Sequence, residues 1–179
     1  MNLLEVLDVD LIDLEMDVAS KDEAIRALAG MLDKKGNIND LDGFIDAVYE
    51  RESIGETGMG NAIAIPHGLT NCVSKASVAI GKTKAPIEWE SLDDQPVRLV
   101  FLLAMPNDNL QNTHLRMLAQ LAAVLAYKEH IDSLMDCKTK EEFFNLFKSY
   151  FDERVNEYRR YHILYMWNCS YIHGKRKID

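Results

Sequence analysis

A histidine that directly follows an Ile-Pro pair is the residue best suited to covalent chemistry. Residues 62–68 read AIAIPHG and come after a glycine-rich loop over residues 55–60. Pro66 fixes its own φ at about −65° and favours extended geometry at Ile65, so a short predicted strand delivers His67 at a defined point. Neutral imidazole is a good nucleophile near pH 7 and leaves easily, which suits a transferable phosphoryl group. From these residues alone, a catalytic and a structural histidine both remain open.

Glycines on both sides of this histidine suggest access to its ring. We expect Gly68 to remove bulk on one side, so that a large partner can approach His67. We also expect the loop over residues 55–60 to fold close by, with backbone amides free to face an anion.

The elements expected around the histidine are helices that alternate with strands. Ser20-Lys21-Asp22-Glu23 is a capping box, which predicts a helix that ends near Gly36. The other predicted elements are a helix over 41–52, strands over 73–82 and 97–105, and helices over 109–126, near 130–135 and after Thr139. The strand over 97–105 is almost entirely apolar, so we expect it to be central. This pattern predicts an α/β fold with a mixed β-sheet flanked by helices on both faces.

Side-chain burial is also predicted at several positions. The helix over 109–126 is expected to bury a stripe made of Leu115, Leu118, Ala122 and Leu125. The histidines outside the motif, His130, His162 and His173, are expected to face solvent. The isolated cysteines Cys72, Cys137 and Cys169 fit reduced, structural thiols.

Composition restricts the class of protein. With 179 residues, 47% hydrophobic and 27% charged, the chain fits one globular domain plus a short appendage. A formal net charge of −9 argues against nucleic-acid binding. The sequence has no apolar run long enough to span a membrane and its first residues are acidic, so we expect a cytoplasmic protein without direct membrane insertion.

The segment Glu52–Gly68 resembles the active-site segment of enzyme IIA domains of the fructose–mannitol class of bacterial phosphotransferase systems, which include a nitrogen-regulatory branch. Similar residues recur at Pro86-Ile87-x-Trp89, Pro96-Val97, Met105-Pro106 and His114-Leu115. The resemblance covers roughly residues 3–150. It predicts a IIA domain over 1–151 and a C-terminal extension of unknown role over 152–179. One departure is Ala62, where the family more often has glycine; a positive φ there would cost about 1–2 kcal/mol.

The resemblance also implies roles for individual residues. His67 would be the phosphorylated nucleophile, and His114 and Arg51 would stabilise the phosphoryl oxygens. Asn61 and Thr57 are weaker candidates, which would either position the phosphate or order the loop. We predict no metal, because His67 and His114 have no evident third ligand, and the resemblance implies no cofactor.

The function implied is that of a phosphotransferase with a phosphohistidine intermediate. The domain would accept a phosphoryl group from phospho-HPr and pass it to a cysteine of a IIB domain during fructose- or mannitol-class sugar uptake. The alternative is a regulatory IIA-like protein of the nitrogen type, whose phosphorylation state controls partner proteins; a degenerate domain kept only for binding is a weaker one. The sequence leaves open the sugar, a homo-oligomeric state, and whether the domain belongs to a larger IIABC protein.

Overall fold

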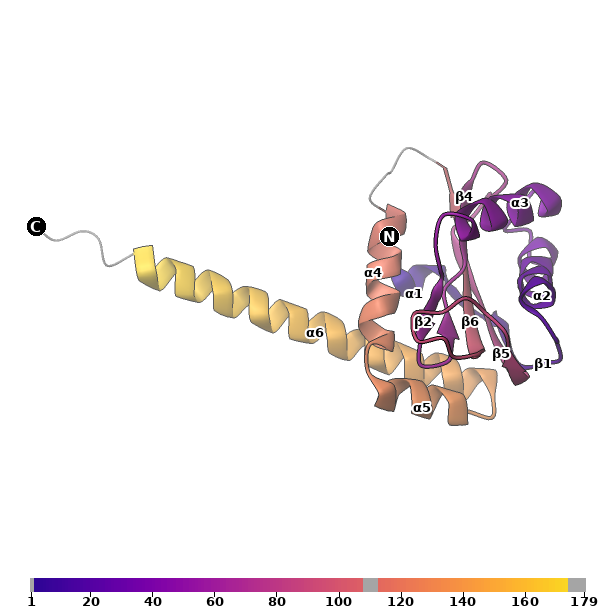
Figure 1. Cartoon of the computed structure of the whole chain (residues 1–179). Helices are drawn as coiled ribbons and strands as arrows, with labels where there is room; N and C mark the ends of the chain where they lie inside the picture. The colour runs from indigo at the N-terminus through magenta and orange to yellow at the C-terminus, as the bar shows by residue number, and fades with distance from the viewer. Residues whose placement is uncertain (1, 108–112, 174–179) are drawn as a thin grey trace, which may run out of the picture.

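The computed structural model describes residues 2–107 and 113–157 with their side chains and residues 158–173 as backbone. A central sheet lies between two layers of helices (Figure 1). In chain order the elements are α1 (Leu3–Val6), β1 (Leu7–Met16), α2 (Lys21–Lys34), α3 (Leu41–Glu52), β2 (Gly58–Gly60), β3 (Ile63–Ala64), β4 (His67–Thr70), β5 (Ser77–Ile87), β6 (Val97–Pro106), α4 (Thr113–Leu125), α5 (Lys128–Asp136) and α6 (Lys140–His173).

The sheet is mixed, and β6 is its centre. The strand order is β1-β5-β6-β3-β2, and β4 also pairs with β6. β6 runs antiparallel to β5 and parallel to β3 and β4, whereas β1 runs parallel to β5. Because β6 is hydrogen-bonded on both sides and covered on both faces, its sequence is almost continuously apolar.

Alternate side chains of β6 serve two separate cores. Phe101 and Leu103 join a cluster with α4, α5 and α6, which includes Phe143 and Phe147. Val100, Leu102 and Ala104 join a second cluster on the opposite face, with α2 and α3. Helices therefore cover both faces of the sheet, as the sequence predicted.

Side-chain caps start both helices of the second core. Ser20 Oγ accepts a hydrogen bond from the amide of Glu23 at 3.2 Å, and Glu23 Oε2 accepts one from the amide of Ala19 at 2.8 Å. The Ser20 half of the predicted capping box is therefore confirmed, whereas the Glu23 carboxylate binds the amide one residue before the N-cap. Asp40 caps α3 by accepting from the amide of Gly43 at 3.0 Å. The position where α3 ends matters for function because Arg51 lies in its last turn.

Several elements differ from the prediction. The edge strand β1 was not predicted, since its acidic, alternating sequence LDVDLIDLEM lies half exposed. The predicted strand before His67 is only Ile63–Ala64, and His67 itself opens β4. β5 starts and ends later than predicted and takes in Pro86. The predicted start of the 109–126 helix lies outside the described residues.

The burial predicted for two segments was only partly right, since Leu125 is buried as predicted but Leu115 and His130 are not placed as expected. In α4 the buried residues are Met117, Leu121, Val124 and Leu125, whereas Leu115 is 56% exposed. His130 does not face solvent: it is buried, its Nδ1 lies 2.8 Å from the carbonyl of Val124, and its ring stacks on Tyr150. Because α5 and α6 pack against α4, the buried stripe of α4 is displaced by about one residue from the predicted stripe.

The last helix continues beyond the predicted domain boundary. α6 runs from Lys140 to His173 without a break, and its later part extends away from the body (Figure 1). Its first half is anchored by Phe143, Phe147 and Phe151 in the core. The guanidinium of Arg154 also lies over the Tyr127 ring, 4.0 Å from its centroid. In the described part of the chain, no helix is long and apolar enough to cross a membrane.

Candidate functional site

His67 is held by two hydrogen bonds that define its protonation. Its Nδ1 lies 3.0 Å from the carbonyl oxygen of Ile65. A carbonyl only accepts hydrogen bonds, so Nδ1 carries the ring proton and Nε2 carries the lone pair. The Nε–H of Arg51 donates to Nε2 at 3.0 Å, which is consistent with that tautomer. The nucleophilic nitrogen of the neutral ring is therefore Nε2.

Close packing of α3 against β4 brings Arg51 to His67. Gly68 is buried beside Phe44 and Val48, and a Cβ at Gly68 would lie 2.9 Å from the Phe44 ring. The role expected for Gly68, opening one side of the ring, was therefore wrong. Its missing side chain allows α3 to approach the strand that carries the nucleophile.

A second hydrogen bond fixes the orientation of the Arg51 guanidinium. Nη1 donates to the carbonyl of Gly55 at 3.0 Å, in the loop after α3. The guanidinium is thus held on one side by the loop and on the other by the imidazole. A planar group with several N–H donors next to Nε2 is well suited to bind the oxygens of a group transferred to that atom.

The surroundings of His67 keep the ring neutral. Burial lowers the pKa of His67, and electrostatic interactions with Arg51 and His114 lower it further. The hydrogen bond to Ile65 and the charge of Glu52 act in the opposite direction without reversing the shift. A neutral imidazole at pH 7 is the form that can attack phosphorus.

His114 lies in the first turn of α4, close enough for its charge to affect His67. Its Nδ1 is buried and has no hydrogen-bond partner among the described residues. A buried ring nitrogen without a partner costs free energy, so it marks a place where a polar group can be received. The role of His114 in holding phosphoryl oxygens stays a prediction.

A cavity of about 300 Å³ opens at the imidazole. Its polar lining residues are Arg51, Glu56, Thr57 and His67. Its apolar wall consists of Met59, Ile65, Leu118, Ala119 and Ala122. The glycine loop, the strand exit and α4 therefore enclose one site at His67.

The chain is similar to known proteins of one family. The profile of the family "Phosphoenolpyruvate-dependent sugar phosphotransferase system, EIIA 2" matches residues 5–150. The chain belongs to this family. The EIIA domain is 34% identical over 146 residues to the fructose-specific EIIABC component of Bacillus subtilis, covering 82% of the chain but only 23% of that relative. It is 32% identical over 136 residues to the fructose-specific EIIA component of Haloferax volcanii, covering 76% and 88% of the two chains.

Nitrogen-type proteins are also similar to this EIIA domain. The nitrogen regulatory protein of Pseudomonas aeruginosa is 33% identical over 128 residues, covering 71% of the chain and 82% of the relative. The crystal structure of IIA-Ntr from Neisseria meningitidis superposes with a TM-score of 0.75 at 30% identity, covering 80% and 97%. IIA mannitol of Escherichia coli, solved in complex with phosphorylated IIB mannitol, gives a TM-score of 0.68 at 25% identity, covering 79% and 96%.

The two weaker candidates of the EIIA domain, Thr57 and Asn61, line different cavities. Thr57 is at the cavity, but its hydroxyl donates to Glu52 Oε1 at 2.6 Å and accepts from Trp89 Nε1 at 3.2 Å. These contacts fit the loop-ordering alternative. Asn61 lines a neighbouring cavity of about 330 Å³. Its backbone amide donates a hydrogen bond to Asp93 Oδ2 at 2.9 Å.

The backbone around Asn61 is strained. Asn61 and Ala62 have φ values of 53° and 63°. The positive φ considered for Ala62 is therefore present, at the position where the family more often has glycine.

The sequence reasoning missed the residues that support the loop of the EIIA domain, namely Lys21, Glu52 and Trp89. Glu52 lies inside the recognised motif, directly after Arg51, so its position was a usable signal. In the part of the chain that the structure describes, no three His, Cys, Asp or Glu side chains are grouped to hold a metal ion.

Proposed function

We propose that the EIIA domain is a phosphoryl carrier, in which Nε2 of His67 accepts a phosphoryl group from phospho-HPr and passes it to a cysteine of a IIB domain. The observation that carries this proposal is the hydrogen-bonded pair of Arg51 and a neutral His67 at the mouth of a cavity. The family to which the chain belongs supports the same role.

In the first step, the lone pair of Nε2 attacks phosphorus in line with the bond to the donor nitrogen. That bond breaks, and its electron pair returns to the donor histidine. The proton on Nδ1 stays on the His67 ring, where the carbonyl of Ile65 stabilises the positive charge that develops. Arg51 leaves Nε2 and binds the phosphoryl oxygens, and His114 is the second candidate for this role.

In the second step, the phosphoryl group leaves His67 for a different acceptor. A IIB thiolate attacks phosphorus, the Nε2–P bond breaks, and its electron pair returns to the imidazole. The loose transition state of phosphoryl transfer requires mainly positioning and charge stabilisation, which the fixed imidazole and the anchored guanidinium supply. No metal or nucleotide takes part in either step.

The surface next to the site supports docking of protein partners. Ile54, in the loop after α3, is 78% exposed, and Met59, in β2, is 46% exposed. Leu69 and Leu115 are also exposed, two residues after His67 and one after His114. Exposed apolar side chains near a reactive group are typical of surfaces that bind other proteins.

Labelling and transfer in sequence test the proposal. The protein is incubated with labelled phosphoenolpyruvate, enzyme I and HPr, separated from them, and mixed with a purified sugar-specific IIB domain. We expect uptake on His67 followed by loss of label to IIB. No uptake by folded protein would contradict the carrier role.

The relatives named as nitrogen regulatory proteins favour one alternative, a regulatory domain whose phosphorylation state controls partner proteins. In that case the domain takes up label from HPr but retains it with every sugar-specific IIB domain tested. The two functions therefore differ only at the second step of the experiment.

A further inference from the structure

A buried carboxylate lies immediately behind the candidate site. Glu52 follows Arg51 at the end of α3, and its side chain is only 5% exposed. Glu52 Oε2 lies 2.7 Å from Nζ of Lys21, at the start of α2. A buried charge is costly unless it is paired, so this ion pair explains why Glu52 is tolerated there.

Lys21 is held in place by more than one partner. Its Nζ also lies 2.7 Å from Glu90 Oε2 and sits 5.2 Å from the centroid of the Trp89 ring. Partial burial opposes its charge, but the hydrogen bonds and charges of Glu52 and Glu90 outweigh that effect and raise the pKa of Lys21. Lys21 is therefore a permanent cation at neutral pH.

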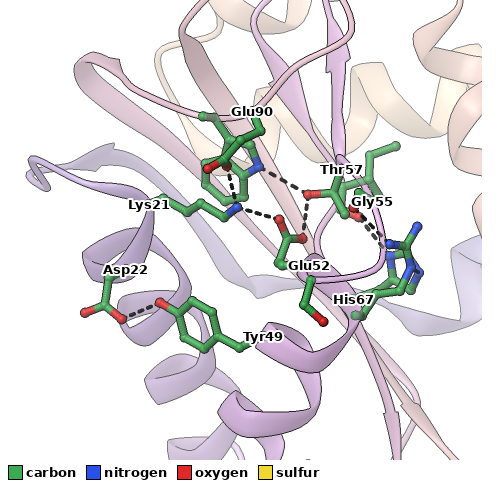
Figure 2. Close-up of polar contacts among 12 residues, drawn as sticks. Lys21, Asp22, Tyr49, Glu52, Gly55, Thr57, His67 and Glu90 are labelled. Carbon is green, nitrogen blue, oxygen red and sulfur yellow. Dashed lines mark hydrogen bonds and ion pairs between the residues drawn. The ribbon is translucent and has the colours of Figure 1, made fainter.

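Glu52, held by Lys21, also binds the loop after α3. Its Oε1 accepts a hydrogen bond from the Thr57 hydroxyl, and Trp89 Nε1 donates a hydrogen bond to the same hydroxyl. The Thr57 side chain is therefore held from two sides. The loop between Glu52 and Thr57 contains Gly55, whose carbonyl holds Arg51. Figure 2 shows Glu52 between Lys21 on one side and the loop with His67 on the other.

We propose that Glu52, held by Lys21, is a positioning residue for phosphoryl transfer: it fixes Thr57, and through the loop the Gly55 carbonyl that keeps the Arg51 guanidinium at Nε2 of His67. This inference rests on the proposed function, because it assigns Glu52 a role in that reaction. Glu52 itself touches neither the phosphoryl group nor the imidazole. Its effect on the rate arises because a small misplacement of a catalytic group costs up to about a hundredfold.

We expect two shifts in the pKa of His67, which have opposite signs in the variants Thr57→Val and Glu52→Gln. The shift caused by Thr57→Val distinguishes a role in positioning Arg51 from a role in stability alone. Arg51 and His114 lower the pKa of His67, whereas Glu52 raises it. Thr57→Val keeps the Glu52 charge but releases the loop, so Arg51 is no longer held at Nε2 and the pKa of His67 rises. Glu52→Gln keeps an acceptor for Thr57 but removes the charge, so the pKa of His67 falls.

The experiment measures two quantities on the full-length chain. Nitrogen-15 NMR follows the titration of His67 and the Nε–H signal of Arg51, and single-turnover kinetics follow transfer from phospho-HPr. The variants are Thr57→Val, Thr57→Ser and Glu52→Gln. The matched control is Tyr49→Phe, because the Tyr49 hydroxyl also joins α3 to α2, by donating to Asp22, but has no contact with the loop.

We expect Thr57→Val to slow transfer by about tenfold to a hundredfold, to raise the pKa of His67 and to shift the Arg51 Nε–H signal toward that of a solvent-exposed guanidinium. Thr57→Ser retains the hydroxyl and should restore both properties. Tyr49→Phe should lower stability without changing either property. If Thr57→Val proves to be unfolded, Thr57→Ala tests the same loss of the hydroxyl through the Arg51 Nε–H signal and the His67 titration.

Wild-type titration and Arg51 signals in folded Thr57→Val, with wild-type transfer rates, would overturn the inference and leave the carrier function intact. A wild-type protein that phospho-HPr does not label would instead contradict the carrier function. The NMR measurements need no phosphoryl donor, so in that case they still decide whether Glu52 and Thr57 position Arg51.

Discussion

The Nε–H of Arg51 donates a hydrogen bond to Nε2 of His67 across 3.0 Å, so the guanidinium occupies the atom that a phosphoryl group must reach. Its Nη1 is anchored separately on the carbonyl of Gly55. In the resting domain Arg51 therefore orients the imidazole and lowers its proton affinity. When a phosphorylated partner arrives, a rotation about the anchored end would move the Nε–H from the nitrogen to the phosphoryl oxygens.

Arg51→Ala should slow phosphoryl uptake by about a hundredfold to a thousandfold, the usual effect of removing one donor to a developing charge. Arg51→Lys should recover only part of the rate, because an ammonium group lacks the planar fork. His114→Ala should also slow uptake without abolishing it. Rapid-quench measurements of transfer from phospho-HPr decide each case.

The control for these variants is His130→Phe, a substitution of another buried histidine that packs on Tyr150. We expect this variant to be less stable but to transfer at the wild-type rate. Unchanged kinetics in Arg51→Ala or His114→Ala would remove that residue from the site.

His67 should titrate below its ordinary value of about 6.5, because burial, Arg51 and His114 lower its pKa. The unfolded chain then takes up a proton at a higher pH than the folded protein does. The stability linked to His67 is thus fully present above about pH 6.5 and is lost as the pH falls through the folded pKa.

Two measurements check this expectation. NMR titration gives the folded pKa of His67, and urea unfolding between pH 5 and pH 8 gives the stability profile. His67→Gln should flatten the profile in that range. A folded pKa at or above the ordinary value would show that the ring is not kept neutral by its surroundings.

The fold could be predicted where local patterns were strong. The capping box at Ser20, the limits of α3 and the apolar run of β6 each followed from side-chain chemistry that acts within a few residues. β1 could not, because its alternating acidic sequence becomes a strand only by pairing with β5. The buried stripe of α4 shifted for the same kind of reason, since α5 and α6 pack on it from distant parts of the chain.

The site was predictable in its residues but not in its contacts. The spacing of Arg51 and His67 pointed to them through a family resemblance, and the structure brings them together. Contacts between residues that are far apart in the chain could not be predicted from the sequence. Gly68 allows the approach of α3. Glu52 depends on Lys21 from another helix, and Thr57 depends on Trp89 from the loop after β5.

Ala62→Gly should stabilise the domain by about 0.5–1 kcal/mol. Ala62 has a φ of 63°, where a Cβ costs about 1–2 kcal/mol, and the greater freedom of glycine in the unfolded chain offsets part of the gain. Urea unfolding of the two proteins measures the difference. The same change at Ala29, inside α2, is the control and should destabilise; a loss of stability at Ala62 would contradict the strain.

Truncation after Glu157 removes most of the predicted extension, which covers residues 152–179 and follows the EIIA domain assigned to residues 1–151. The shortened chain keeps Arg154, its contact with Tyr127 and its ion pair with Glu157. We expect phosphoryl uptake by His67 to be unchanged, since the described site residues all precede the extension. Sedimentation shows whether the extension controls a homo-oligomeric state, and a folded but inactive truncation would place the extension in the site.

The most direct test of the central claim is to identify the atom that carries the phosphoryl group. The protein, labelled with nitrogen-15 at histidine, is phosphorylated with phosphoenolpyruvate, enzyme I and HPr and studied by phosphorus–nitrogen correlation NMR. We predict a single phosphohistidine at Nε2 of His67, with the proton still on Nδ1, and no uptake in folded His67→Ala. Phosphorus on Nδ1, phosphorylation of another residue, or full uptake by His67→Ala would contradict the account.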